Sequence, residues 1–144
     1  GWCRLGPRES FARLEASTAL ARIDDAEVWS VVCFVVHPTA KRQGVASALL
    51  EEACGRAVAR GASILEAYPV RGNHMNLDAY TGYLPMFLAA GFEAVADLPF
   101  GELHPCPVRG VDQLRELAVA EVARLGGHRR VAQEAAAVLP PAPD

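Results

Sequence analysis

The stretch from Glu27 to Gly61, E-V-W-S-V-V-C-F-V-V-H-P-T-A-K-R-Q-G-V-A-S-A-L-L-E-E-A-C-G-R-A-V-A-R-G, decides the fold. It opens with a nearly unbroken run of β-branched and aromatic residues, Val28 to Val36. Such a run predicts a strand that is buried on both faces of a parallel or mixed sheet. Pro38 ends this strand because proline cannot donate to the hydrogen-bond ladder of a sheet.

An amphipathic helix is predicted after this strand. Its apolar positions form two adjacent rows, Val45, Leu49, Ala53, Ala57 and Ala46, Leu50, Cys54, Val58. Charged side chains fall outside this broad apolar face. Gly61 suits the end of the helix, and the apolar run Ser63–Tyr68 predicts a second strand. The order of strand, helix and strand predicts a right-handed parallel crossover, and therefore an α/β fold with a mixed central β-sheet.

The basic loop between this strand and helix, K-R-Q-G-V-A at residues 41–46, is the main candidate for a binding site. The first N–H groups of a helix lack partners within it, and the helix dipole is positive there, so an anion is stabilised. Gly44 allows a ligand to approach the backbone, and Lys41 and Arg42 add positive charge. Phosphate binding is one interpretation, and a turn whose basic residues serve solubility is the other. Two common phosphate-binding patterns are absent from the sequence. There is no G-x-x-x-x-G-K-S/T, and no G-x-G-x-x-G follows a predicted strand.

The run V-V-H-P-T-A-K-R-Q-G-V-A-S-A-L-L, with A-A-G-F further along the chain, resembles the acetyl-CoA signature of the GNAT superfamily of N-acyltransferases. The family loop reads Q/R-x-x-G-x-G/A, and Lys41, Gly44 and Ala46 stand at its three specified places. Lysine at the first place departs from the pattern but keeps the charge. The resemblance runs from Trp2 to about Leu98. It implies the acyl-CoA N-acyltransferase fold, with acetyl-CoA as co-substrate and no metal.

The resemblance also implies which residues bind the donor. In the family fold, Val28–Val36 and the next parallel strand splay apart, and the pantetheine arm pairs with the exposed backbone like an added strand. The polar loop Arg71–Tyr80 lies over the open end, where Asn76 is assigned to the cofactor, although most residues of such loops only form the loop. The expected cofactor-binding residues are Phe34, Val35, Val36, Lys41, Arg42, Gln43, Gly44, Val45, Ala46 and Asn76.

Acyl transfer to an amine requires a neutral amine, support for the oxyanion and a proton for the leaving thiolate. Because a lysine-like amine has a pKa near 10.4, it must lose a proton at neutral pH. Glu66 is the candidate base, and binding of a cationic substrate is its alternative role. Backbone N–H groups near Phe34 and Val35 can support the oxyanion.

Protonation of the thiolate is where the chain departs from the family. Many members have a tyrosine four residues before the glycine of the G-F pair, and that position is Phe87 here. Either Tyr83 or Tyr68 substitutes, or the thiolate leaves unassisted, since the pKa of a CoA thiol is close to that of Cys, about 8.5. Packing is the alternative role of Tyr83. A covalent mechanism through Cys33 is disfavoured, because the sequence has no adjacent histidine that could act as its base.

Breaker residues and hydrophobic periodicity predict the remaining elements. The expected elements are a strand Gly1–Leu5, a helical turn Arg8–Leu14, a helix from about Thr81 to Ala90 with Pro85 in its first turn, a strand Phe92–Leu98 and a last strand near Pro105–Val108. Asp24-Asp25 is interpreted as a solvated turn, with a base or metal-binding pair of carboxylates as the alternative.

A boundary is predicted between Pro99 and Gly110, where the composition shifts to Gly, Pro and His. Residues 1–108 are expected to form a GNAT-type acetyl-CoA-binding domain, and residues 109–144 a helical tail. The tail helices, Val111–Leu125 and His128–Leu139, are interpreted as a dimer contact, a cover for the core or a disordered segment. Because the chain starts inside a strand, the resemblance implies that the first part of the fold precedes it.

Length and composition narrow the class of protein. With 144 residues, 51% of them hydrophobic, the chain can bury one sizeable core. Its formal charge of −3 argues against nucleic acid as the main partner, and no apolar stretch reaches the roughly 18 residues of a membrane span. Four cysteines without a C-x-x-C pair favour reduced packing residues over disulfides or zinc ligands. Together with the lack of a signal peptide, this predicts a cytoplasmic location.

The sequence therefore predicts an N-acetyltransferase that moves an acetyl group from acetyl-CoA to a primary amine by direct attack. The expected acceptor is the amine of a small molecule or of a peptide. A homodimer is one assembly that the sequence allows. The first alternative is a module of the same fold that binds acyl-CoA without turnover. The second is a subunit whose role depends on a partner.

Overall fold

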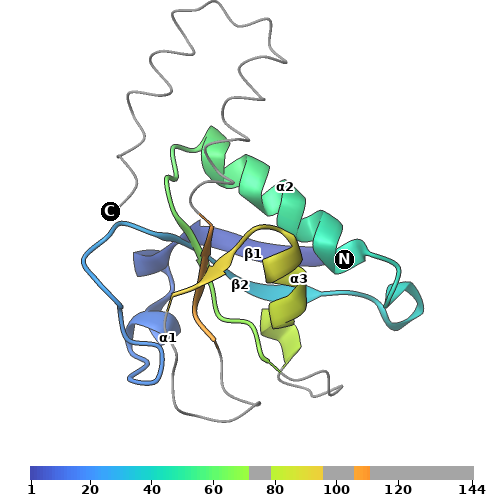
Figure 1. The fold of residues 1–144 in the computed structure, drawn as a ribbon, viewed down its shortest axis with the longest axis horizontal. Helices are drawn as coiled ribbons and strands as arrows, with labels where there is room; N and C mark the ends of the chain where they lie inside the picture. The colour runs from blue at the N-terminus through green and yellow to red at the C-terminus, as the bar shows by residue number, and fades with distance from the viewer. Residues whose placement is uncertain (72–78, 96–105, 111–144) are drawn as a thin grey trace, which may run out of the picture.

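The computed structural model describes residues 1–71, 79–95 and 106–110, and within these ranges the chain forms one mixed sheet with helices on it (Figure 1). The strands are β1 (Trp2–Pro7), β2 (Trp29–Val35), β3 (Leu65–Ala67), β4 (Glu93–Ala94) and β5 (Val108–Gly110). The helices are α1 (Ala12–Glu15), α2 (Val45–Ala59) and α3 (Leu84–Ala89), with 3₁₀ turns η1 (Arg8–Ser10), η2 (Pro38–Ala40) and η3 (Ala79–Thr81). The predicted α/β class with a mixed sheet is confirmed.

The sheet has the strand order β1-β2-β3-β5-β4. β2 pairs parallel with β3, and α2 joins the two strands, as the crossover prediction requires. The remaining neighbours, β1 with β2, β3 with β5 and β4 with β5, are antiparallel. β2 and β3 are shorter than the predicted strands, and β2 is only partly buried, so its continuous apolar run overstated its burial.

Two apolar cores lie on the two faces of this sheet. The larger core joins α2 and α3 to the sheet through Leu50, Cys54, Phe87 and residues of β2, β3 and β5. Leu65 and Ala67 of β3 belong to it, whereas Tyr68 belongs to a second core with Phe11 and Leu14 of the α1 region. This division follows from strand geometry, because successive residues of a strand point to opposite faces of the sheet.

Helix α2 begins and ends where the sequence predicts. Gly44 precedes it as the N-cap, and its buried residues are Leu50, Ala53, Cys54 and Ala57. At its end the N–H of Gly61 donates to the carbonyl of Val58 at 2.9 Å, and the N–H of Ala62 donates to the carbonyl of Ala57 at 3.0 Å. This pair of bonds is a Schellman motif, which satisfies carbonyls at the end of the helix.

The predicted helix from Thr81 to Ala90 is wrong in its first turn. Thr81 ends η3, and α3 begins only at Leu84, with Pro85 in its first turn as expected. Gly82 has φ +87°, and Tyr83 is extended at φ −106° and ψ 137°, so neither continues a helix. Tyr83 instead forms an isolated parallel bridge with Val70.

The segment between β1 and β2 agrees with its prediction. Phe11 and Leu14 are buried, and the N–H of Ala26 donates to Asp24 Oδ1 at 3.0 Å, which is the backbone bond expected of an aspartate turn. The four cysteines are free. Burial raises the pKa of the Cys54 thiol to about 12, so it stays protonated at neutral pH and serves as a packing residue.

Several predictions fall on residues that the structure does not describe. These are the assignment of Asn76 to the cofactor, the end of the strand Phe92–Leu98 and the two tail helices in 111–144. The last predicted strand is found slightly later in the chain, as β5.

Candidate functional site

The loop before α2 presents free backbone amides to the outside. Gly44 has φ +78°, a left-handed conformation that favours glycine, and no side chain caps the helix. The first bond of α2 runs from the N–H of Ala48 to the carbonyl of Gly44 at 3.0 Å, so the amides of Val45, Ala46 and Ser47 precede the helical ladder. A Cβ built on Gly44 would meet no atom within 4 Å. The backbone of Gly44 is therefore uncovered on the side where a side chain would stand.

Hydrogen bonds within the loop hold it in this shape. The N–H of Ala40 donates to the carbonyl of His37 at 2.9 Å. The side chain of Gln43 donates to the carbonyl of Thr39 at 2.8 Å, so Gln43 braces the loop. His37 Nδ1 lies 2.8 Å from the hydroxyl of Thr39. Arg42 adopts φ +57°, which is uncommon for a residue with a side chain and often occurs at ligand clamps.

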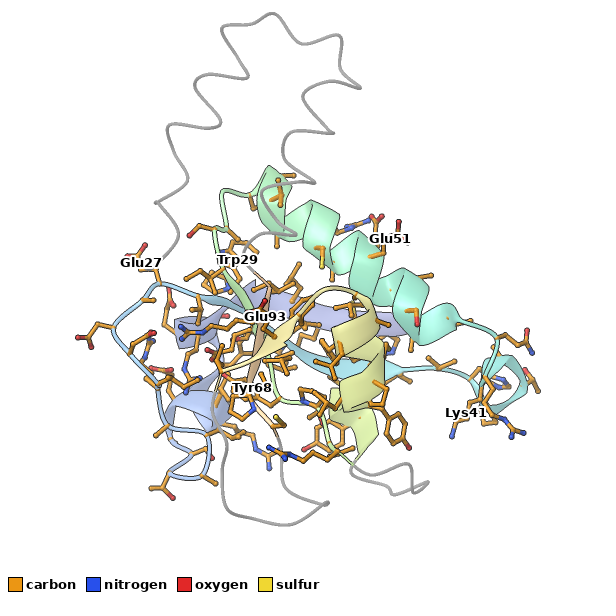
Figure 2. All side chains as sticks on the ribbon, viewed as in Figure 1. Glu27, Trp29, Lys41, Glu51, Tyr68 and Glu93 are labelled. Atoms are coloured by element: carbon orange, nitrogen blue, oxygen red, sulfur yellow. The ribbon has the colours of Figure 1, made fainter. Side chains whose placement is uncertain are left out.

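Lys41 and Arg42 are exposed on this loop, and Figure 2 shows Lys41 at its tip, away from the sheet. Among the described residues no ion pair involves either side chain. Two unpaired cations beside unpaired helix amides make the loop strongly attractive to phosphate groups.

β2 loses its parallel neighbour halfway along. Its pairing with β3 ends at Val31 opposite Ala67, although β2 continues to Val35. At the same place Val32 has no partner in β1, because Arg4 pairs with Cys33 while Leu5 pairs with Val31. This is a β-bulge, which bends a strand and re-aims its groups and is frequent beside functional sites. Figure 1 shows the outer half of β2 leading directly into the loop before α2.

The bulge sets which amides face the gap that β3 leaves. The N–H of Trp29 donates to the carbonyl of Ile64 at 2.9 Å, so alternate residues from Trp29 to Val31 point their backbone groups to β3. The extra residue shifts this alternation by one position. We infer that Phe34 turns its backbone groups to the open side, whereas Val35, opposite Trp2, turns its groups to β1. Val36 lies one residue beyond β2.

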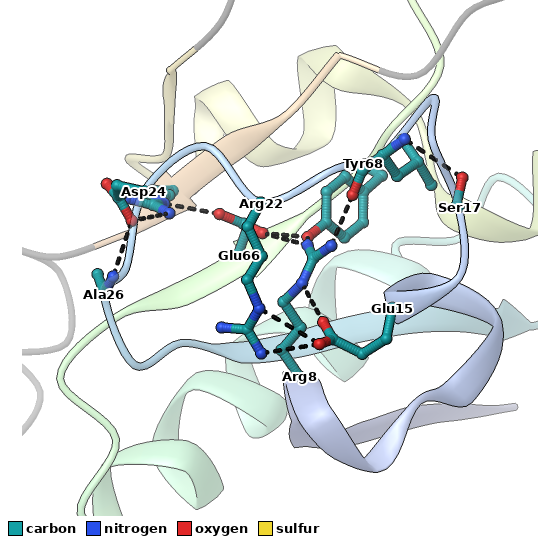
Figure 3. A network of polar contacts seen from close by, with 10 residues as sticks. Arg8, Glu15, Ser17, Arg22, Asp24, Ala26, Glu66 and Tyr68 are labelled. Carbon is teal, nitrogen blue, oxygen red and sulfur yellow. Dashed lines mark hydrogen bonds and ion pairs between the residues drawn. The ribbon is translucent and has the colours of Figure 1, made fainter.

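Glu66 lies in a closed network of charges on the other face of the sheet (Figure 3). Its side chain is 1% exposed. Arg8 Nη1 donates to Glu66 Oε1 at 3.1 Å, and Arg109 Nε donates to Glu66 Oε2 at 2.7 Å. Glu66 is thus buried and bonded on both oxygens, rather than a carboxylate on a rim.

Tyr68 belongs to the same network. Its hydroxyl donates to Glu66 Oε1 and accepts from Arg8 Nη1. Burial, reinforced by the hydrogen bond to Glu66, raises the pKa of Tyr68 above its ordinary value, so the hydroxyl stays protonated at neutral pH. The structure therefore brings Glu66 and Tyr68 together, in direct contact.

The network continues to the surface through Arg109, Asp24 and Glu15, which the sequence did not connect with Glu66. Arg109 donates to both oxygens of Asp24, at 2.7 and 3.0 Å. Arg8 donates to Glu15 at 2.7 Å and to the carbonyl of Leu20 at 2.6 Å. Together these bonds tie the segment between β1 and β2 to β3 and β5. The sequence shows charged residues beside apolar strands, but it does not indicate which of them form ion pairs with one another.

Tyr83 and Phe87 lie on the side of the sheet that carries α2. Tyr83 is half-buried and is the N-cap of α3, which packs into the larger core, whereas Tyr68 belongs to the core on the opposite face. Phe87 is 0% exposed and packs edge-on against Phe34 at 6.0 Å and Phe92 at 5.3 Å between ring centroids. The residue at the family's tyrosine position is therefore part of the core.

Comparisons with known proteins agree with this geometry. The family model described as "Acetyltransferase (GNAT) family" matches residues 3–83, more than half of the chain. No curated protein and no solved structure gives a significant match. Within the described ranges no group of three or more His, Cys, Asp or Glu side chains could hold a metal ion. No helix in the same ranges is long and apolar enough to cross a bilayer.

Proposed function

Because the chain belongs to the acetyltransferase (GNAT) family, whose members are typically acyltransferases that use acetyl-CoA, we propose that it moves an acetyl group from acetyl-CoA to a primary amine. The observation that carries this proposal is the loop before α2. It combines amides without helical partners, a left-handed Gly44 with open space in front of it, and two unpaired cations. A diphosphate is the ligand chemistry that such a loop recognises.

The proposed donor site extends from this loop along β2. The diphosphate binds the amides at Gly44, Val45 and Ala46, with Lys41 and Arg42 beside it. The pantetheine arm then pairs with the backbone of Phe34 and Val36, where β3 has left the strand. The backbone N–H of Phe34, which faces the gap, supports the oxyanion of the tetrahedral intermediate, whereas Val35 does not contribute as expected, because its groups turn to β1. A donor of this kind typically contributes about 3–4 kcal/mol.

The ion pairs of Glu66 restrict its role in the proton transfers of the reaction. Glu66 would have to give up an ion pair to accept a proton from an amine, since Arg8 and Arg109 occupy its two oxygens. We therefore propose that Glu66 orients the hydroxyl of Tyr68 and that the ammonium group of the acceptor releases its proton to bulk solvent, through water, before the neutral amine attacks. The leaving thiolate is protonated by Tyr83, or it leaves unassisted because its pKa is only about 8.5.

The alternative is a module that binds acyl-CoA without turnover. The buried position of Phe87 favours this reading, because no hydroxyl stands where many members of the family place their acid. Release of free thiol from acetyl-CoA, measured with a panel of small amines and peptide N-termini, separates the two. Stabilisation by CoA with no thiol released from any amine supports the module.

The test of donor binding is Gly44→Val. A β-branched side chain disfavours the left-handed conformation and so changes the direction of the amides that follow Gly44. We therefore expect acetyl-CoA affinity to fall about 100-fold or more by calorimetry. The control is Gly55→Ala, because Gly55 lies inside α2 with open space at its Cβ. If acetyl-CoA binds Gly44→Val as tightly as the unchanged protein, or binds neither, the proposal fails.

A further inference from the structure

Thr81 carries a buried hydroxyl that has no hydrogen-bond partner among the described residues. Its Oγ1 is shielded from solvent and makes no hydrogen bond within the part of the chain that the structure describes, and the same holds for the hydroxyl of Ser30. A buried hydroxyl without a partner loses its water and gains nothing in return, so folded proteins rarely keep one without a use. Ser30 adjoins Glu66 in the closed network, whereas Thr81 lies elsewhere in the fold.

The position of Thr81 is fixed by backbone bonds on its C-terminal side. The N–H of Val70, just beyond β3, donates to the carbonyl of Gly82 at 3.0 Å, and the N–H of Leu84 returns to the carbonyl of Val70 at 2.9 Å. Gly82 also packs tightly, because a Cβ there would lie 2.9 Å from Phe87 Cε2. Thr81 is therefore anchored to the end of the strand that has separated from β2.

On its other side, η3 packs against β2. The half of β2 beyond Val31 is the half that β3 does not pair with. Thr81 thus belongs to an element that packs against β2 and is bonded to the end of β3. Under the proposed function, the arm of the acyl donor pairs with the half of β2 beyond Val31, and its two amides and thioester offer several carbonyl oxygens.

We propose that the Thr81 hydroxyl donates a hydrogen bond to the arm of the bound acyl donor and so positions it along β2. This inference rests on the proposed function and adds to it a side chain that contacts the donor. The hydroxyl is desolvated before the ligand arrives, so binding gains the hydrogen bond without a further loss of water from Thr81. The left-handed Gly82 and the bonds to Val70 supply the rigidity that such positioning needs.

The test compares Thr81→Val, which keeps the shape, with Thr81→Ser, which keeps the hydroxyl. For Thr81→Val we expect the affinity for CoA and for acetyl-CoA to fall about three- to tenfold by calorimetry. Thr81→Ser should stay within about twofold of the unchanged protein. The affinity for 3′-phospho-ADP, the nucleotide part of CoA without its arm, should be the same in all three proteins.

A role in folding alone would give a different pattern. In that case Thr81→Val would have a lower melting temperature without ligand, and its affinities for CoA and 3′-phospho-ADP would change together. We expect its melting temperature to be equal or higher, since the unpaired hydroxyl is gone. Equal CoA affinity in Thr81→Val and the unchanged protein overturns the role of Thr81 while donor binding stands. Failure of the unchanged protein to bind CoA overturns the proposed function itself.

Discussion

The loop before α2 and the network around Glu66 are both rich in charge, but they are built in opposite ways. In the loop, Lys41 and Arg42 are exposed without an ion pair, and the first amides of α2 precede its ladder. In the network, Arg8 and Glu66 are almost fully buried, and each bonds to several partners within the chain. The hydrogen-bond donors of the loop remain available to a ligand, whereas the charged groups of the network bond to one another and stabilise the fold.

Because of this difference, substitutions in the two regions should affect different quantities, the stability of the fold and the affinity for a ligand. Charges that are buried and paired are costly to disturb, because removal of one partner leaves the other desolvated. Exposed charges that await a ligand contribute little to stability, and their removal weakens binding instead. Substitutions in the network should therefore change the free energy of unfolding, and those in the loop should change affinity.

The largest effect is expected for Arg8→Met. This change removes the guanidinium that bonds Glu66, Tyr68, Glu15 and the carbonyl of Leu20. We expect the free energy of unfolding to fall by about 3–5 kcal/mol, as is typical when one partner of a buried ion pair is lost. Urea denaturation followed by circular dichroism measures it, and the fraction that stays folded should keep its affinity for CoA.

Arg4→Met is the matched control. Arg4 is exposed on the neighbouring part of β1, and its guanidinium carbon lies 5.2 Å from the centroid of the Phe11 ring. Such an exposed cation–π contact contributes about 0.5–1 kcal/mol, so the loss should be several times smaller. Equal destabilisation by both substitutions would mean that burial in the network adds nothing, and the contrast between the two regions would break down.

Removal of the loop cations should have an intermediate effect. For Lys41→Ala together with Arg42→Ala, we expect CoA affinity to fall about tenfold per charge, since each hydrogen bond to a charged group contributes about 1.5 kcal/mol or more. The melting temperature without ligand should stay unchanged, because neither side chain has an ion pair among the described contacts. Titration calorimetry at two salt concentrations should also show a weaker salt dependence.

The control for this pair is Arg60→Ala. Arg60 is exposed at the opposite end of the same helix, where it is the C-cap residue. Its removal changes the net charge in the same direction but far from Gly44. If Arg60→Ala also weakens CoA binding about tenfold, the effect of removing Lys41 and Arg42 comes from overall charge, and the proposed binding site at the loop is wrong.

The two regions also differ in how far the sequence predicts them. The loop, α2 and β3 follow one another along the chain, so hydrophobic periodicity and the spacing around Gly44 predict the crossover and the open helix end. The network joins Arg8 to Glu66 across 58 positions and Arg109 to Glu66 across 43 positions. A sequence pattern carries no such pairing, and Glu66 therefore resembled a carboxylate available to substrate.

Local geometry set a further limit on prediction. The apolar spacing from Thr81 to Ala90 is helical, but Gly82 takes a left-handed conformation, and Tyr83 bonds as an extended residue beside Val70. These tertiary contacts override helical periodicity, and they place Thr81 in a turn instead of a helix. Likewise the bulge at Val32 has no signal within a run of β-branched residues, yet it decides which amides of β2 face the gap.

The smallest effect is expected at the surface end of the network, where pH can be used. Arg109 bonds to Asp24 and holds the pKa of that carboxyl below its ordinary value. A group with a lowered pKa in the folded state stabilises the fold above its unfolded pKa, about 3.9, and this stabilisation is lost as the pH falls through the folded value. Because the Asp24 side chain is 47% exposed, we expect Asp24→Asn to cost less than about 1 kcal/mol at pH 7.

The pH dependence is what distinguishes this ion pair from simple packing. Urea midpoints of the unchanged protein and of Asp24→Asn should differ at pH 7 and pH 5 and should converge below about pH 4, as the carboxyl of Asp24 takes up its proton. All other acidic residues are common to the two proteins, so their contributions cancel in the comparison. Asp25→Asn is the control, because it removes the same charge at the adjacent residue, which has no ion pair among the described contacts. A difference that persists unchanged at pH 3 would assign the loss to the aspartate turn at Ala26, and the network would then end at Arg109 rather than at the surface.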